Sequence, residues 1–356
     1  MRRRVVVAAV VVLAVLVGGL VSWRLWHRTS TFAGAVQLLP ADTLRASYTD
    51  WATARRLAGG GNLGAASPSG RVNAFLNRAY NRDLTVGSAV DDSTLALSRH
   101  FGFSALDAEW EILGQSKQGQ VDILRMRDDT DLAGLENTLR TLGYTEPSSG
   151  LDTGGTWVGG ADLVARISSG LTPIEQNFVV LPDRHLVLMS DGAQYLTAAA
   201  RAASGKAAGL DSVAGVQKLA ELSGQPDSAV LWTGTFACVD LSMGSASSDE
   251  QRVGAQLVAK VGGINPLSGL VMAQQTDRSV VVVMHFDTSG EAAANLQPRV
   301  DLASGAAPGQ GGSFASRFRV VEGSAKGQEA SMTLRPSGER VVLSDMSQGP
   351  VLFATC

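Results

Sequence analysis

The sequence of 356 residues has few of the side chains from which metal centres and nucleophilic active sites are built. It contains two cysteines and four histidines, His27, His100, His185 and His285. None of these histidines has a second histidine or a cysteine at the spacing of a zinc site. The Gly-x-Ser-x-Gly elbow of many hydrolases is also absent. The sequence therefore predicts no catalytic residue, no cofactor and no metal ligand.

Three short stretches resemble functional motifs, but local structure explains each of them. Ser116 lies between glycines in a stretch that reads as a hairpin turn. The acidic stretch 128–131 lacks the spacing of a calcium loop and stands where a helix begins, so its carboxylates suit the helix dipole. The glycine-rich stretch 59–64 follows an expected helix instead of the strand that a dinucleotide loop requires.

Charged residues make up only 18% of the chain, and hydrophobic residues make up 45%. This balance is typical of a folded protein and excludes extensive disorder. The net charge of −3 combines +5 on residues 1–28 with −8 on the rest. Such an acidic remainder has no electrostatic footprint for nucleic acid, so we expect no nucleic-acid partner.

The longest apolar run is Val5–Trp23, 19 residues without a charge. A helix of about 20 such residues spans the hydrocarbon layer of a bilayer. The positive-inside rule places the preceding arginines in the cytoplasm, and tryptophans favour the membrane interface. The expected interface residues are Arg2, Arg3, Arg4, Trp23 and Trp26. We expect a cytoplasmic tip (1–4), a membrane helix (5–23), a juxtamembrane stalk (24–40) and an extracytoplasmic C-terminal domain in the cell membrane.

A cleaved signal peptide is the alternative interpretation of the same run. Signal peptides have a shorter apolar region, with a small-x-small cleavage site close behind it. The nearest such site, Ala33-Gly34-Ala35, lies well beyond the apolar run. An uncleaved anchor is therefore favoured, and cleavage stays open.

Export would place Cys238 and Cys356 in an oxidising compartment, where disulfides form. Cys356 is the last residue of the sequence, an unusual place for a thiol that only packs. We expect the two to pair, in a bridge worth about 4–5 kcal/mol in the chain-entropy model. Two unpaired thiols are the alternative.

The remaining chain alternates strand-like and helix-like patterns, which predict an α+β fold with a mainly antiparallel sheet built from strand-strand-helix units. Apolar runs around turn residues, each followed by a helical pattern, occur at 108–142, 178–203 and 270–302. The stretches 178–205 and 270–305 share enough detail to suggest an internal repeat, against chance similarity as the alternative. The domain limits are 41–303 for the main domain, 304–312 for a linker or long loop, and 313–356 for a closing β-meander with a third strand at 340–344.

Capping boxes mark several helix starts in this region. The pairs are Asp191 with Gln194, Ser247 with Glu250, and Thr288 with Glu291. In such a box the first side chain and the third helical residue satisfy each other's free backbone N–H groups.

The stretch Leu39-Pro40-Ala41-Asp42-Thr43 introduces the first expected strand. With the N-terminal anchor and the strand-strand-helix rhythm, it resembles a family of uncharacterised bacterial, actinobacterial-type, envelope proteins. The resemblance implies an extracytoplasmic location and this fold class. It implies no activity and no site residues.

These patterns favour a non-catalytic, membrane-tethered domain that binds a protein partner in the cell envelope. A carrier of lipid or another apolar ligand is the first alternative, and it requires an apolar pocket open to the surface. An extracytoplasmic hydrolase is the second, and it requires His100 or His185 beside a carboxylate in a cleft. Trp157, flanked by glycines, is either a contact residue in a loop or a core residue.

Overall fold

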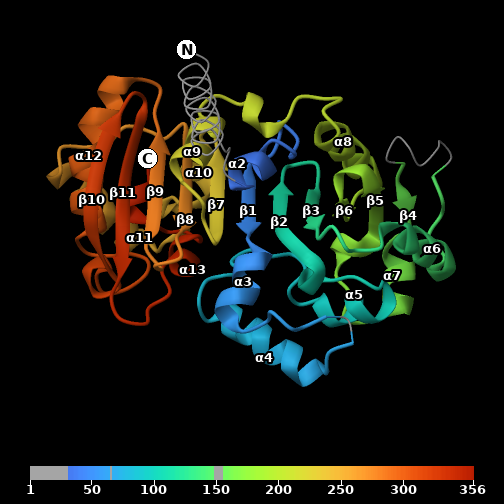
Figure 1. The fold of residues 1–356 in the computed structure, drawn as a ribbon. Coiled ribbons are helices and arrows are strands. Elements are labelled where there is room, and N and C mark those ends of the chain that lie inside the picture. The colour runs from blue at the N-terminus through green and yellow to red at the C-terminus, as the bar shows by residue number, and fades with distance from the viewer. Residues whose placement is uncertain (1–30, 65, 148–154) are drawn as a thin grey trace, which may run out of the picture.

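The computed structural model describes residues 31–64, 66–147 and 155–356. A single antiparallel sheet of 11 strands crosses the molecule in the order β10-β11-β9-β8-β7-β1-β2-β3-β6-β5-β4 (Figure 1). The strands are β1 (Arg45–Thr49), β2 (Ala108–Gln115), β3 (Gln120–Met126), β4 (Trp157–Val158), β5 (Asn177–Leu181), β6 (Leu186–Ser190), β7 (Ser228–Thr233), β8 (Gly269–Gln274), β9 (Val280–His285), β10 (Phe318–Lys326) and β11 (Glu329–Pro336). The expected α+β class with a mainly antiparallel sheet is confirmed.

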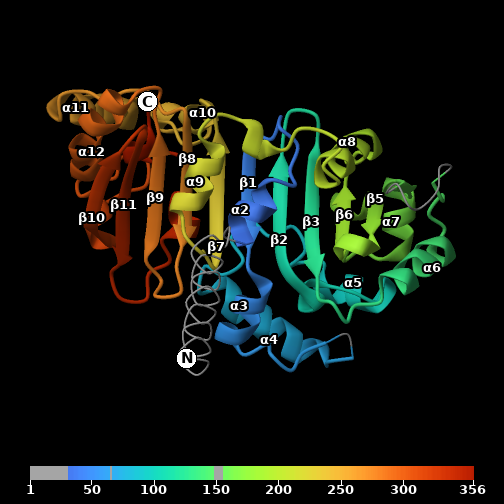
Figure 2. The same cartoon turned by 45° about the horizontal axis from the view of Figure 1, so that its top comes forward.

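Helices cover both faces of this sheet. They are α2 (Thr31–Val36), α3 (Trp51–Ala58), α4 (Ser69–Tyr80), α5 (Thr94–His100), α6 (Leu132–Leu142), α7 (Ala161–Ile167), α8 (Ala193–Ala203), α9 (Val216–Leu222), α10 (Phe236–Asp240), α11 (Ser248–Lys260), α12 (Ser289–Ala303) and α13 (Leu343–Met346). On one face, α2, α8 and α9 pack over the middle of the sheet (Figure 2). The opposite face carries two separate cores, one under α3 to α6 and one under α10 to α13.

Apart from the edge strand β4, the sheet consists of two halves of five strands in the same order, which meet where β1 pairs with β7. In that pair Ser47 lies opposite Val230. A half-turn about this point carries β1 onto β7 and, moving outward, β2 onto β8, β3 onto β9, β6 onto β11 and β5 onto β10. The internal repeat therefore spans each half of the sheet, and β2-β3-α6 is the counterpart of β8-β9-α12.

The sequence comparison of 178–205 with 270–305 matched two units that are not counterparts in this arrangement. Both stretches are a hairpin followed by a helix, as expected. However, α8 packs on the face covered by α2 and α9, whereas α12 packs on the opposite face with α10 and α13. The local pattern was predicted correctly, and the pairing of the two stretches was wrong.

Several local predictions are confirmed by cap geometry. Ser247 and Thr288 accept hydrogen bonds from the backbone N–H groups of Glu250 and Glu291, and both capping boxes are complete. Asp131 caps α6, whose last turn ends at Gly143 in the left-handed conformation with φ 98°. That conformation favours glycine because a β-carbon would crowd the backbone.

Three local predictions are wrong. Asp191 does not cap α8, because the N-cap residue is Gly192 and the Asp191 carboxylate faces the N–H of Gln120 instead. The expected third strand at 340–344 is a loop that runs into α13, so 313–356 closes with one hairpin and short helices. The second part of the expected stalk is also not a stalk, because Phe32, Val36 and Leu39 are fully buried.

The expected membrane helix at 5–23 and its interface residues Arg2, Arg3, Arg4, Trp23 and Trp26 lie outside the described residues. Among the helices that are described, none has the length and apolar character needed to cross a membrane.

The C-terminal residues are fixed to the second half by a covalent bond and a buried cation. Cys238 at α10 and Cys356 form the expected disulfide, with a Cα–Cα distance of 5.4 Å. Nearby, the fully buried guanidinium of Arg299 donates to the carbonyls of Phe353 at 2.7 Å and Thr355 at 3.0 Å. Burial lowers the pKa of Arg299 to about 9, so it still carries its charge at neutral pH.

Replacing both cysteines by serine is expected to lower the free energy of unfolding by about 4 kcal/mol, because the bridge closes a chain separation of 118 residues. Urea unfolding under oxidising conditions measures this difference. The wild type with added reductant is the matched control and should unfold at the same urea concentration as the double variant. If the double variant and the reduced wild type both unfold at the same urea concentration as the oxidised wild type, the bridge does not stabilise the fold.

Candidate functional site

An apolar region of the described surface lies on either side of α11. This helix begins at the Ser247 capping box, but Gly254 is its only fully buried residue. A β-carbon on Gly254 would lie 3.3 Å from the side chain of Met243 and 3.4 Å from that of Leu352. The helix therefore touches the body closely at one point and leaves open space to either side of it.

Two hollows occupy that space. One, of about 480 Å³, lies between α11 and the C-terminal residues and is lined by Met243, Ala255, Val258, Leu352 and Cys356, among others. A second, of about 340 Å³, lies between the end of α11 and the end of α12. Leu352 lines both. Ligand pockets in proteins commonly have such volumes and mainly apolar walls. The disulfide and Arg299 hold the segment that forms the shared wall.

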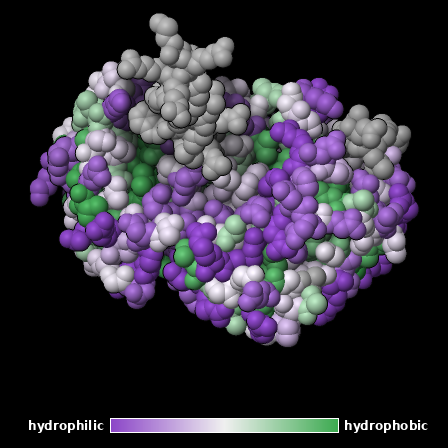
Figure 3. Space-filling model, viewed as in Figure 1, coloured by the Kyte–Doolittle hydropathy of each residue, from purple (hydrophilic) through white to green (hydrophobic). Residues whose placement is uncertain are grey.

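The opposite side of the molecule looks different. The face viewed in Figure 3 is mostly hydrophilic, with hydrophobic residues scattered among polar ones. A further hollow, of about 860 Å³ and lined by polar residues that include Tyr80, Arg317 and Glu339, lies near the start of α11, where Gly309 in its wall donates to Glu250 at 3.0 Å. Scattered apolar residues on a polar surface are usual for a folded protein and do not mark a site.

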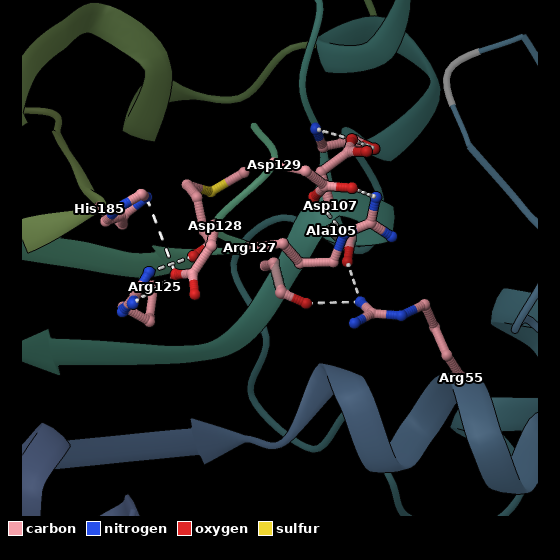
Figure 4. Close-up of polar contacts among 11 residues, drawn as sticks. Arg55, Ala105, Asp107, Arg125, Arg127, Asp128, Asp129 and His185 are labelled. Atoms are coloured by element: carbon pink, nitrogen blue, oxygen red, sulfur yellow. Dashed lines mark hydrogen bonds and ion pairs between the residues drawn. The ribbon is translucent and has the colours of Figure 1, made fainter. Parts of the chain in front are cut away.

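None of the three described histidines, His100, His185 and His285, has the contacts that the hydrolase alternative requires. His185 Nδ1 lies 4.0 Å from Asp128, beyond hydrogen-bond distance, and Asp128 is already bound by Arg125 at 2.9 Å (Figure 4). His285 lies 3.2 Å from Glu329, but both side chains are almost completely buried in neighbouring strands. His100 forms the last turn of α5. Within the described ranges, no group of three or more His, Cys, Asp or Glu side chains could hold a metal ion.

The other motif-like residues take structural roles. Asp129 binds Arg127 at 3.0 Å (Figure 4), and Asp131 caps α6. Ser116 lies in the β2–β3 turn, where its hydroxyl donates to the carbonyl of Gly119. Trp157 belongs to β4 and is fully buried, so it is a core residue.

An unexpected feature is a cluster of carboxyl groups inside the first half. Glu111 on β2 and Asp122 on β3 point to the same face of the sheet, and both are buried. Glu175, in the short 3-10 helix Pro173–Gln176 before β5, is buried beside them and acts on the pKa of Asp122. The signal in the sequence was an acidic residue next to apolar residues of a strand, Glu111 before Ile112-Leu113 and Asp122 between Val121 and Ile123.

Hydrogen bonding within the cluster is uneven. Glu111 accepts from the indole N–H of Trp51 at 2.7 Å, the hydroxyl of Ser88 at 2.7 Å and the backbone N–H of Ala89 at 2.5 Å. Glu175 accepts from the backbone N–H and the hydroxyl of Thr172 through one oxygen, and no described residue donates a hydrogen bond to its other oxygen. Neither carboxyl oxygen of Asp122 has a donor among the described residues.

Burial dominates the electrostatics of these three groups. It raises the pKa of Glu111 to about 7, although its three donors favour the charged form and lower it. Burial, followed by the charge of Glu111, raises the pKa of Asp122 well above its ordinary value. Burial also raises the pKa of Glu175. A carboxyl group without donors in an apolar interior is far more stable with its proton than without it.

Comparisons with known proteins add little to this description. No family model matches the chain, and no curated protein matches it. One solved structure, entitled "Structure of crystal form I of TP0453", aligns over 88% of this chain and 96% of its own, with 8% identity and a TM-score of 0.39. A likeness this distant supports no conclusion about function.

Replacing Trp51 by phenylalanine is expected to lower the free energy of unfolding by about 2 kcal/mol, because Glu111 loses a donor that favours its charged form. The loss should be larger at pH 8 than at pH 5, since Glu111 is ionised only at the higher pH. Urea unfolding at both pH values measures it.

Trp157→Phe is the matched control for Trp51→Phe. It makes the same change of ring at another fully buried tryptophan, which packs against Arg140 instead of a carboxylate. Its cost should be the same at both pH values. If the two variants respond alike, Trp51 acts through packing alone.

Proposed function

We propose that the chain is a non-catalytic, membrane-tethered extracytoplasmic module that binds a protein partner of the cell envelope through the hollows beside α11. The apolar walls of these two hollows are the observation on which the binding role rests. An apolar side chain of a partner that fills such a hollow leaves water, and each fully buried aliphatic or aromatic side chain contributes about 1.5–3 kcal/mol.

Two further observations support the location. The apolar run 5–23 follows three arginines, as in a membrane anchor with a cytoplasmic N-terminus. The disulfide between Cys238 and Cys356 suits an oxidising compartment outside the cytoplasm. The same bridge fixes Leu352 and its neighbours, so the shared wall is already ordered before a partner arrives. Ordering a wall in advance lowers the entropic cost of binding.

A small apolar ligand, such as a lipid, is the second candidate. The volume of about 480 Å³ and the apolar wall of the larger hollow favour it. It differs from the first candidate in what accompanies the purified protein, because a lipid carrier retains lipid without a protein partner. For the hydrolase alternative, no contact among the described residues supplies a histidine and a carboxylate in an open cleft.

Replacing Ala255 by tryptophan is expected to reduce the amount of co-purified partner at least about tenfold. Ala255 is an exposed residue of α11 that lines the larger hollow, so an indole there fills the hollow without disturbing the core. Affinity purification of the full chain from its own membranes, with mass spectrometry of both proteins and lipids, measures the loss.

Gln256→Trp is the matched control. Gln256 is the next residue of the same helix, is exposed, and lies outside the lining of both hollows. It should retain the wild-type partners. Loss of specific lipid in Ala255→Trp, with no change in protein, would favour the carrier instead. An identical set of proteins and lipids from both variants would remove the hollows from the account.

A further inference from the structure

The pairing register of the sheet brings two acidic side chains together in the first half. Leu113 lies opposite Asp122, and Glu111 lies opposite Leu124, so Glu111 and Asp122 are diagonal neighbours on one face. Side chains in such diagonal positions are within reach of each other across two strands. The exposed fractions are 1% for Glu111 and 0% for Asp122, so water does not separate them from the core.

The second half of the sheet has the same positions and fills them differently. Thr49 in the first half corresponds to Trp232 in the second. Glu111 lies opposite Thr49 and Leu270 lies opposite Trp232, so Leu270 is the counterpart of Glu111. In the same way, Leu113 corresponds to Met272. Asp122 lies opposite Leu113 and Val282 lies opposite Met272, so Val282 is the counterpart of Asp122. Leu270 and Val282 are fully buried in the second core. The fold therefore does not require acids at these two positions, since it packs well with aliphatic side chains there.

The contacts around the pair leave one way to satisfy Asp122. Three donors hold Glu111, but no donor reaches either oxygen of Asp122 among the described residues. A proton on one of the two carboxyls supplies the missing hydrogen bond, because a protonated carboxyl donates and a carboxylate accepts.

The charged groups that face the pair make a bound proton more favourable still. They are Asp91, in the loop before α5, and Glu175, before β5, and both are acidic. The buried guanidinium of Arg55 on α3 donates to the carbonyls of Ala105 and Ala108 and not to the pair (Figure 4). No ion pair in the described part of the chain includes Glu111, Asp122 or Glu175, and no metal-binding group is found there.

We propose that Glu111 and Asp122 form a proton-binding pair that shares one proton across β2 and β3 and makes the stability of the first half depend on pH. In the folded protein the proton bridges the two strands inside the core. When it leaves, two negative charges face each other where the interior has no cation to balance them, and the packing under α3 to α5 loosens. This inference does not depend on the proposed partner or on the membrane anchor.

The direction of the pH effect follows from linkage. Both pKa values are raised in the folded state, whereas in the unfolded chain the two carboxyls titrate near pH 4. The stabilisation by the proton is therefore complete below about pH 4 and is lost as the pH rises through the raised folded pKa values, of which that of Glu111 is about 7. Each extra proton held by the folded state raises the unfolding constant about tenfold per pH unit within that window.

The test compares full-length wild type with Asp122→Asn in detergent micelles, by urea unfolding from pH 5 to pH 8. An asparagine has the same shape, carries no charge, and donates an N–H to Glu111 in place of the shared proton. The unfolding constant of the wild type should rise with pH relative to that of Asp122→Asn, by at least about tenfold between pH 5 and pH 8. Hydrogen exchange at the two pH values should locate the loosening in β2 and β3.

Asp129→Asn is the matched control, because Asp129 is a fully exposed carboxylate whose pKa is lowered by Arg127. It should follow the wild type at every pH. If Asp122→Asn folds poorly, the infrared band of a protonated carboxyl in the wild type at pH 7, absent in Glu111→Gln/Asp122→Asn, supports the pair. Parallel pH profiles for wild type and Asp122→Asn would overturn the proposal. Stabilisation of the wild type by Ca²⁺ or Mg²⁺, lost in Asp122→Asn, would also overturn it and identify a cation site.

Discussion

The pairing of β1 with β7 is the contact on which the rest of the structure depends. Five residues of β1 pair with five residues of β7, from distant parts of the sequence, at the centre of the sheet, with Arg45 opposite Trp232 and Thr49 opposite Ser228. The pair joins two half-sheets of equal strand order and gives them one continuous core on the face beneath α2, α8 and α9. Without it, each half would expose a central strand edge with unpaired backbone groups.

The two halves share a strand order but differ in the residues at equivalent positions. The first half buries carboxyl groups at Glu111 and Asp122, at a cost in stability that a bound proton offsets. The second half has the apolar residues Leu270 and Val282 at those positions, both fully buried in its core. It also carries the disulfide, Arg299 and the hollows beside α11. We infer that sensitivity to pH and binding of a partner belong to different halves of one sheet.

Much of the local structure could be predicted from the sequence, because its causes are local. Turn residues defined the hairpins, and the Ser247 and Thr288 boxes fixed two helix starts. The strand order could not be predicted, since the β1–β7 pairing joins residues far apart in the chain. The burial of Phe32 and Val36 was missed because a short apolar helix after a membrane anchor looks like a stalk. The disulfide was predicted from two cysteines alone.

The candidate sites were harder to predict than the fold. The hollows beside α11 depend on how one helix sits against the C-terminal residues, which no periodicity encodes. Each of the two strands has an acid beside apolar residues, which the sequence shows, but only the register shows that Glu111 and Asp122 are neighbours. Residue patterns define elements, whereas sites arise where distant elements meet.

The most direct test of the proposed role is the side of the membrane on which the domain lies. Protease added outside cells stripped of their outer layers should remove everything beyond the anchor, and Cys238 and Cys356 should react with a thiol reagent only after reduction. Full protection of the chain until the membrane is opened, with both thiols reactive without reductant, would contradict the account.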